Sequence, residues 1–265
     1  MCVIQPIYTL HPSNTPLLIS MPHNGFAIPE PLRSRMTQAA QSSPDTDWFL
    51  DRLYAFAAEM GIGMLNPHFS RYVIDLNRPA DNANLYPGQD TTSLCPVDRF
   101  DSGPIYLSGQ EPDDQEIQSR IDTYWKPYHQ ALQLEVRRLH QEFGKVLIFE
   151  AHSIAAEVPR FFSGKLPDLN FGTQSGQSCS SDLEARMVNI AENSGYSWVL
   201  NGRFKGGYIT RAYHQVPEQI YTLQLELSQA TYLDPQRLTW KADQAEEIIP
   251  VLKKVVQSAL DWLNS

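Results

Sequence analysis

Residues 146–153 have the sequence VLIFEAHS, in which four apolar residues lead to an acid and then a histidine. Such an apolar run directly after Gly144-Lys145 is typical of a strand covered on both faces. Ligand-binding groups of open α/β sheets gather at the carboxyl ends of such strands. The segment therefore predicts a central strand that delivers His152 to the edge of a sheet.

A second segment follows the same pattern. Residues 17–25, LLISMPHNG, are an apolar run that leads to His23, and Pro22 and Gly25 end the strand around it. A single histidine after a strand is usually a hydrogen-bonded loop residue, but two of them on separate strands indicate convergence on one metal site. The sequence has no HExxH or CxxC motif, so a third ligand must come from elsewhere in the chain.

Composition limits the class of protein. With 265 residues, 42% of them hydrophobic, the chain can bury one large core, and we expect a single domain over residues 1–265. We see no apolar run long enough for a membrane span and no secretory signal. Three cysteines, widely spaced, argue against a disulfide framework and favour a reducing cytoplasm.

Charge excludes further classes of partner. A net charge of -9 with only 21 basic residues disfavours nucleic acid and acidic membrane surfaces. Basic residues that cluster therefore need a local reason, such as an acidic small molecule. Oligomeric state stays open at this stage.

The segment between residues 43 and 61 predicts a helix that carries an acidic ligand. Residues 43–47, SPDTD, offer capping acceptors, and apolar residues then recur at helical spacing until Gly61. Capping alone explains one of the two acids, Asp45 and Asp47. The other is free to complete a His, Asp, His set of ligands for zinc.

Residues 70–79, SRYVIDLNRP, predict an alternating strand with charged residues at both ends. Arginine forks match carboxylate oxygens two at a time, so Arg71 and Arg78 are candidates to contact an acidic substrate. A structural ion pair with Asp75 is the alternative. It does not explain why Asn77 and Arg78 both lie beside Pro79 at the end of the segment.

The rest of the chain predicts regular elements around one long loop. We expect strands near 3–10, 64–66, 198–201, 207–211 and 220–227, and helices over 111–143, broken at Pro127, 181–195 and 243–263. Residues 81–110 and 158–180 are expected as loops, the first of them a lid or a substrate wall. His129 and His140 are interpreted as structural. Glu226 ends the last strand, where a buried acid must be paired or used, and it is the candidate base.

Six motifs occur together and in order, and they carry a likeness to a known family. They are PHNG at 22–25, DTDW at 45–48, SRYVIDLNRP at 70–79, EAHS at 150–153, GRFKGG at 202–207 and QLEL at 224–227. The chain resembles the N-formylglutamate amidohydrolases over nearly its whole length. The resemblance implies a zinc-dependent hydrolase that splits N-formyl-L-glutamate into formate and glutamate during histidine breakdown.

That family is in turn similar to zinc carboxypeptidases and aspartoacylases, which implies a three-layer α/β/α domain with a mixed, mainly parallel central sheet. Those relatives take two ligands from HxxE, but here Phe26 stands three residues after His23. Asp47 is our replacement, with Asp45 as the alternative. DLNR at 75–78 matches the aspartoacylase pattern that contacts substrate, and Glu226 matches the catalytic glutamate of those relatives.

The predicted site therefore has three groups of residues. The zinc ligands are His23, Asp47 and His152, and the substrate-binding residues are Asn77, Arg78, Arg203 and Arg211. The catalytic residues are Glu226 as base and Arg71 for the oxyanion, with Arg78 as the alternative for the oxyanion. Two alternatives stay open: a related zinc deacylase or carboxypeptidase with another N-acyl substrate, and a metal-free protein that binds a dicarboxylate.

Overall fold

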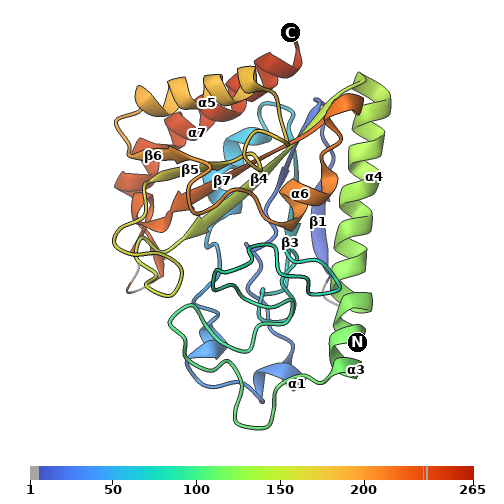
Figure 1. Cartoon of the computed structure of the whole chain (residues 1–265), viewed down its shortest axis with the longest axis vertical. Helices are drawn as coiled ribbons and strands as arrows, with labels where there is room; N and C mark the ends of the chain where they lie inside the picture. Colours follow the sequence, from blue (N-terminus) through green and yellow to red (C-terminus); the bar gives the residue numbers. More distant parts are fainter. Residues whose placement is uncertain (1–5, 235, 237) are drawn as a thin grey trace.

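A seven-stranded sheet forms the centre of the computed structural model, which describes residues 6–234, 236 and 238–265 (Figure 1). In spatial order the strands are β1 (Tyr8–His11), β3 (Gly63–Pro67), β2 (Leu17–Ser20), β4 (Val146–Ile154), β7 (Ile220–Ser228), β5 (Leu169–Gly172) and β6 (Trp198–Leu200). Strands β3, β2, β4 and β7 run parallel, and β1, β5 and β6 run the other way. The predicted mixed, mainly parallel sheet is confirmed.

Helices cover both faces of this sheet, which gives the expected three layers. The helices are α1 (Glu30–Arg33), α2 (Leu50–Leu53), α3 (Asp114–Arg120), α4 (Lys126–Phe143), α5 (Ser181–Glu192), α6 (Tyr208–Tyr213) and α7 (Ala242–Leu263). Figure 1 shows α5 and α7 on one side of the sheet and α4 and α6 on the other. Short 3-10 segments lie at Ala40–Ser42, Ala55–Ala57, Val216–Glu218 and Gln229–Thr231, and a small hairpin pairs β8 (Leu233–Asp234) with β9 (Thr239–Trp240).

Side chains that alternate along the central strand β4 point into two different parts of the core, one on each face of the sheet. Leu147 and Phe149 pack in the cluster that includes α5 and α7, whereas Ile148 packs in the cluster that includes α4. Every residue of β4 is buried because both faces are covered. The same alternation turns Glu150 and His152 toward the α4 face, on the side of the sheet that carries Ile148.

Two predicted elements before residue 80 are wrong. The single helix expected up to Gly61 is replaced by the four residues of α2 and a 3-10 turn, because Phe49 adopts a left-handed conformation with φ of 61°. The strand expected over 70–79 is a series of buried turns, in which Val73 N donates to Ser70 O. Its polar side chains offer the backbone local partners that compete with a sheet ladder.

Two predictions beyond residue 157 are also wrong. Residues 208–211 of the strand expected over 207–211 belong to helix α6, and Gly207 caps that helix. Residues 169–172, expected within a loop, form β5, which pairs antiparallel with β7. For β5, pairing with β7 overrides the weak local preference of the segment. Part of the first expected strand, residues 3–5, lies outside the described residues, and β1 begins at Tyr8.

The remaining long elements agree with the expectations. The helical pattern of 111–143 is α3, a π-helical turn at Ile121–Trp125 and α4, with Pro127 in the first turn of α4, where its missing N–H is tolerated. Helix α5 is capped by Ser180, one residue earlier than expected, whose hydroxyl accepts from Leu183 N. The loop over 81–110 and the helix up to Leu263 are confirmed.

Cys95 and Cys179 are buried free thiols, and Cys2 lies outside the described residues. No helix within the described part of the chain is both long enough and apolar enough to cross a membrane. The expectation of a single domain over residues 1–265 stays a prediction.

Candidate active site

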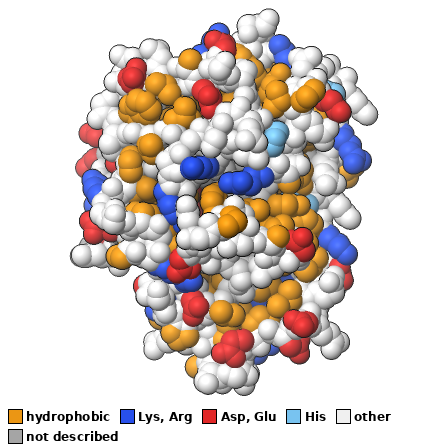
Figure 2. Space-filling view, in the orientation of Figure 1, with side chains coloured by type: hydrophobic (Ala, Val, Ile, Leu, Met, Phe, Trp, Pro, Cys, Tyr) orange, Lys and Arg blue, Asp and Glu red, His pale blue; other side chains and the backbone are white. Residues whose placement is uncertain are grey.

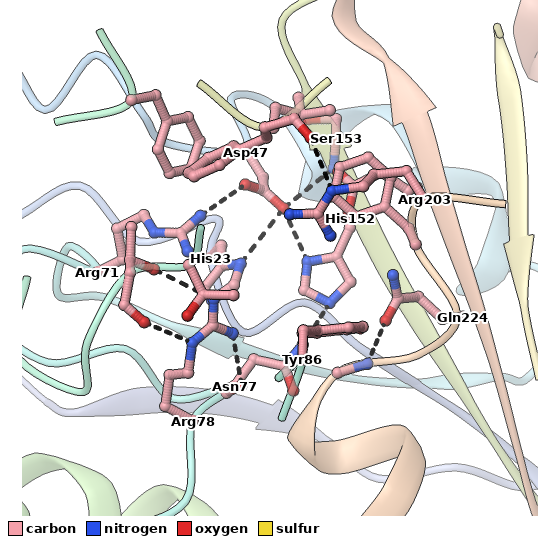
Figure 3. A pocket seen from close by; sticks show the side chains of 18 of the residues that line it. His23, Asp47, Arg71, Asn77, Arg78, Tyr86, His152, Ser153, Arg203 and Gln224 are labelled. Carbon is pink, nitrogen blue, oxygen red and sulfur yellow. Dashed lines mark hydrogen bonds and ion pairs between the residues drawn. The ribbon is translucent and has the colours of Figure 1, made fainter. Parts of the chain in front are cut away.

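Three predicted metal ligands meet in one buried cluster. One donor atom from each of His23, Asp47 and His152 lies within 4.8 Å of the other two. The Oδ2 atom of Asp47 is 3.0 Å from Nδ1 of His152 and 3.8 Å from Nδ1 of His23 (Figure 3). Both imidazoles therefore present Nδ1 to the same carboxylate.

Local backbone contacts hold these side chains in place. His23 lies in the turn after β2, where Asp47 N donates to the His23 carbonyl at 3.0 Å. The turn needs Gly25, because a Cβ there would lie 2.3 Å from the Phe69 carbonyl oxygen. Ser153 N, at the end of β4, donates to Asp47 Oδ2 at 3.0 Å. Three separate chain segments are thereby joined at the cluster.

The outward nitrogens of both histidines bind further carboxylates. Nε2 of His23 lies 2.6 Å from Asp75 Oδ1, and Nε2 of His152 lies 2.7 Å from Glu150 Oε1. Metal-binding histidines typically donate their second ring N–H to a carboxylate in this way, which fixes the tautomer and leaves the other nitrogen free for the ion. Glu150 and Asp75 were quoted in the sequence motifs without this role. The signal for Glu150 is its position two residues before His152 on one strand face.

The two histidines of the cluster differ in their electrostatic surroundings. Burial and the Arg71 guanidinium lower the pKa of His23, so its ring is neutral at neutral pH. Burial opposes protonation of His152 too, but its hydrogen bonds with Asp47 and Glu150 raise its pKa well above the usual value. Asp47 and Glu150 thus stabilise positive charge on His152, whereas burial and Arg71 disfavour it on His23.

The donor set fits zinc. Two imidazoles and one carboxylate are a typical set of protein ligands in catalytic zinc sites, where a further position stays open for water. The alternative ligand Asp45 is turned elsewhere, since its Oδ2 accepts from the Tyr72 hydroxyl and from Phe100 N at 2.9 Å. Asp47 is therefore the acid that lies beside the two histidines.

Arg71 is buried behind the cluster. Its Nη2 lies 2.6 Å from Asp75 Oδ2, its Nη1 lies 4.0 Å from Asp47 Oδ1, and its guanidinium is 4.8 Å from the centre of the Phe100 ring. Burial alone would raise the pKa of Asp75, but His23 and Arg71 lower it well below the usual value. Asp75 thus stays ionised between them.

Glu226 lies on the neighbouring strand. It is the register partner of His152 across the parallel pair β4 and β7, and its residue is 7% exposed. Burial raises the pKa of its carboxyl to about 8. No residue in the described part of the chain makes a hydrogen bond to this carboxylate. Glu226 is therefore free to exchange a proton with a ligand.

A cavity opens over the cluster, and Arg71, Arg78 and Arg203 line it together with Glu226. Arg78 is held by Thr92, whose carbonyl accepts from Nε at 2.9 Å. Arg203 is held in the same way by the Phe161 carbonyl at 2.9 Å. The net charge of the chain is -9, so this concentration of guanidinium groups is a local feature. Figure 2 shows Lys and Arg side chains near the middle of the viewed face.

The structure does not bring every predicted substrate contact to this cavity. Arg211 is absent from its lining and lies 4.9 Å from the ring centre of Tyr86, with Nε donating to the Gly206 carbonyl. Asn77 lines the cavity, but its amide is engaged: Nδ2 donates to Glu150 and Oδ1 accepts from Ile209 N at 2.9 Å. In this structure both residues support neighbouring parts of the site.

Tyr86 is a lining residue that sequence reasoning missed. Its hydroxyl donates to the Gly206 carbonyl, and its ring lies between the guanidinium groups of Arg203 and Arg211, at 5.6 and 4.9 Å. The loop over 81–110 is thereby joined to the turn at 202–207. The predicted role of this loop as a wall of the cavity agrees with the position of Tyr86.

Comparison with known proteins shows which family the chain is similar to. A family profile described as N-formylglutamate amidohydrolase matches residues 15–233. The chain is 43% identical to an N-formylglutamate deformylase of Pseudomonas putida, over 97% of this chain and 96% of the relative. It is 45% identical to an N-formylglutamate deformylase of Pseudomonas aeruginosa, over 93% of each.

Solved structures support the fold. The structure of an N-formylglutamate amidohydrolase from Ralstonia eutropha JMP134 superposes with a TM-score of 0.84 at 23% identity, covering 97% of this chain and 98% of the other. A gene product of Agrobacterium tumefaciens, Atu2144, superposes with a TM-score of 0.70 at 17% identity, covering 96% of each chain. At these identities the likeness concerns the arrangement of the chain alone.

Proposed function

The chain belongs to the N-formylglutamate amidohydrolase family, and from this we propose that it is a metal-dependent hydrolase that converts N-formyl-L-glutamate to formate and L-glutamate. The observation that carries the proposal is the buried cluster of His23, Asp47 and His152 beneath a cavity lined by arginines. The names of the two Pseudomonas relatives support the choice of substrate. A place in histidine breakdown, which the family resemblance implies, stays a prediction.

We propose that His23, Asp47 and His152 hold one zinc ion. When bound, the ion would supply Lewis-acid activation of the attacking water and of the formyl carbonyl. The cluster supports this choice through its donor set and through the carboxylates behind each histidine.

Glu226 is the proposed general base. It takes a proton from the attacking water, whose oxygen bonds to the formyl carbon, and gives that proton to the glutamate nitrogen as the carbon–nitrogen bond breaks. A pKa raised by burial suits a group that must first accept and then release a proton near neutral pH. The carboxylate also lacks a competing hydrogen bond from the described residues.

Arginines supply the complementary charge. Arg71 is proposed to stabilise the negative oxygen of the tetrahedral intermediate, a kind of contact whose loss typically costs about 3 to 4 kcal/mol. Arg78 and Arg203 line the same cavity and are proposed to bind the two carboxylates of the substrate. Asn77 and Arg211, also predicted as substrate contacts, are proposed to act through the residues that they hold, Glu150 and Tyr86.

The test combines metal analysis with formate release. We expect the purified protein to contain zinc and to release formate from N-formylglutamate much faster than it releases acetate from N-acetylglutamate. His152→Ala should lose zinc and activity together, because it removes a ligand. His140→Ala is the matched control, since His140 lies on α4 away from the cluster and its ring bonds the Glu218 carbonyl.

Three results would contradict parts of the proposal. Full zinc content in His152→Ala would refute the metal centre. Undiminished formate release after complete metal removal would refute metal dependence, and equal rates on the two acyl groups would refute the proposed substrate.

A further inference from the structure

Gln224 is a buried cavity residue to which the mechanism above gives no role. It lies on β7 two residues before Glu226 and therefore on the same face of the strand. It is 3% exposed and lines the cavity. Its register partners are Glu150 on β4 and Gly172 on β5. Gln224 thus lies beside Glu226, deeper along the strand.

The orientation of the Gln224 amide is set by its backbone partner. Oε1 accepts from Gly207 N at 2.8 Å, and a backbone N–H only donates, so the oxygen must face Gly207. Nε2 then points the other way, and it makes no hydrogen bond to any residue in the described part of the chain. Figure 3 shows this nitrogen turned away from the Gly207 bond, toward the space between His152 and Arg203.

The turn that carries Gly207 is tightly packed, so this orientation is rigid. A Cβ at Gly172 would lie 2.7 Å from Gly206 N, and a Cβ at Gly207 would lie 2.2 Å from Asn77 Nδ2. The turn over 202–207 is therefore pressed against β5 and the DLNR segment. Gln224 cannot exchange its oxygen and nitrogen without breaking the bond to Gly207.

Nε2 of Gln224 faces the cavity without a partner among the described residues, so it is free to donate a hydrogen bond to a bound ligand (Figure 3). The hydrogen bond to Gly207 uses only the amide oxygen of Gln224. It therefore does not explain why an amide nitrogen is present at this position. A donor that faces a cavity lined by Arg78 and Arg203 suits an acceptor of negative charge, and a carboxylate oxygen is such an acceptor. Because the amide is neutral, it adds a donor without an ion pair to the nearby Glu226.

We propose that Gln224 binds a carboxylate of the substrate through Nε2, next to Arg203, and that it determines specificity for an acidic substrate. This inference rests on the proposed function and names a further residue of the same site. In Figure 3, Arg203 and Gln224 lie on one side of the two histidines, and Arg71 and Arg78 lie on the other. The two sides would receive the two carboxylates of N-formylglutamate.

Two variants separate ligand binding from the structural bond to Gly207. Gln224→Glu keeps an acceptor for Gly207 N and replaces the donor with a second carboxylate oxygen. Gln224→Met removes both the acceptor and the donor and keeps a side chain of similar volume. Gln130→Glu on the exposed side of α4 is the matched control for the change in charge. Thermal unfolding of each variant checks that the fold is retained.

The substrates are N-formylglutamate, N-formylglutamine and the α-amide of N-formylglutamate. Both Gln224 variants should lower kcat/KM for N-formylglutamate about tenfold or more, mainly through KM, the size expected for a hydrogen bond to a charged group. The loss should shrink for the one amide analogue that lacks the bound carboxylate. That analogue identifies whether the α- or the side-chain carboxylate meets Gln224.

Calorimetric binding of L-glutamate gives a readout that does not depend on turnover, and we expect both variants to weaken it about tenfold or more. A loss in Gln224→Met with none in Gln224→Glu would overturn the inference, because Gln224 would then only anchor Gly207. Equal losses on all three substrates, or no loss on any, would overturn it as well. If the wild type does not hydrolyse N-formylglutamate, the proposed function is wrong. Glutamate binding still tests Gln224 in that case, because unchanged binding in both variants would contradict its role.

Discussion

At the scale of single residues, Glu150 and Glu226 show how neighbouring strands give two carboxylates different roles. Glu150 is completely buried, and its oxygens accept from His152 Nε2 at 2.7 Å and from the Thr210 hydroxyl at 2.5 Å. The Glu226 carboxylate accepts no hydrogen bond from the described residues and faces the cavity. Glu150 is therefore a positioning residue, whereas Glu226 is available to react.

Substitution with glutamine should separate these roles. Glu226→Gln should keep its metal while kcat falls about 100-fold or more, the usual scale for losing proton transfer. Glu150→Gln should weaken metal binding about tenfold, because the Nε2–H of His152 loses its charged acceptor. Competition with a chelator measures the metal affinity, and formate release under saturating metal measures kcat. The opposite pattern would be weakened metal binding in Glu226→Gln and unchanged metal binding in Glu150→Gln. It would show that the roles of the two glutamates are reversed.

At the scale of elements, the DLNR segment is held in place by helix α4 without any strand pairing of its own. Nε2 of His129 lies 2.9 Å from the Leu76 carbonyl, and Nδ1 lies 2.7 Å from the Tyr213 hydroxyl of α6. The His129 ring also stacks on Trp125 with ring centres 3.8 Å apart. The structural role expected for His129 is thus a specific one, because it joins α4 and α6 to the segment that carries Asp75 and Asn77.

This contact predicts acid sensitivity of the fold. Burial lowers the pKa of His129 to about 3, although the bond to the Leu76 carbonyl opposes the shift. The unfolded chain takes up the proton near pH 6.5 and the folded chain does not, so the contribution of His129 to stability is complete above about pH 6.5. It is lost as the pH falls from there toward 3, by about 1.4 kcal/mol per pH unit.

Denaturant unfolding of the wild type and of His129→Gln between pH 7 and 4 tests this. Glutamine retains a donor for Leu76 and does not titrate. The wild type should be the more stable protein at pH 7, and its advantage should shrink steadily below pH 6.5. Parallel stability curves for the two proteins would show that His129 does not take up a proton on unfolding.

At the scale of the whole molecule, the site is built from segments far apart in the chain. The parallel strands β2, β4 and β7 are neighbours in the sheet, so their carboxyl ends meet at one edge. His23 follows the first, His152 lies near the end of the second and Glu226 near the end of the third. Asp47 reaches the same edge from the turn before α2. An ion bound by these residues would therefore stabilise the assembled sheet and not one local loop.

Metal should raise the stability of the folded protein accordingly. At a free metal concentration 100 times the Kd, binding adds about 2.7 kcal/mol to the free energy of unfolding. We expect zinc to raise the Tm of metal-depleted protein by several degrees, and we expect His152→Ala to abolish this rise. Leu252→Ala, on the buried face of α7, is the control: it should lower the free energy of unfolding by about 2 to 5 kcal/mol with or without metal and keep the zinc-dependent rise in Tm. An equal rise in His152→Ala would place the stabilising ion elsewhere.

Local pattern in the chain is enough to predict the central strands, the long helices and the residues at the strand ends. Buried parallel strands appear in the sequence as short apolar runs, and α4 and α7 appear as apolar residues at helical spacing. These patterns are visible because side chains repeat every 2.0 residues along a strand and every 3.6 residues along a helix, whatever the rest of the fold. His23, His152 and Glu226 stand out for the same reason, since each is a polar side chain at or just beyond the end of such a run. The order of the motifs then identified the family.

The hydrogen-bond and contact partners of the site residues were decided only by the tertiary structure. Glu150 behind His152, Asp75 behind His23, Arg211 behind Tyr86 and the free nitrogen of Gln224 all depend on which segments become neighbours and in what register. The DLNR segment looked like a strand by alternation, yet it forms turns because its buried polar groups find partners on other elements. These choices follow from long-range packing and hydrogen bonding, whose free energies outweigh local preference and leave no periodic trace in the chain.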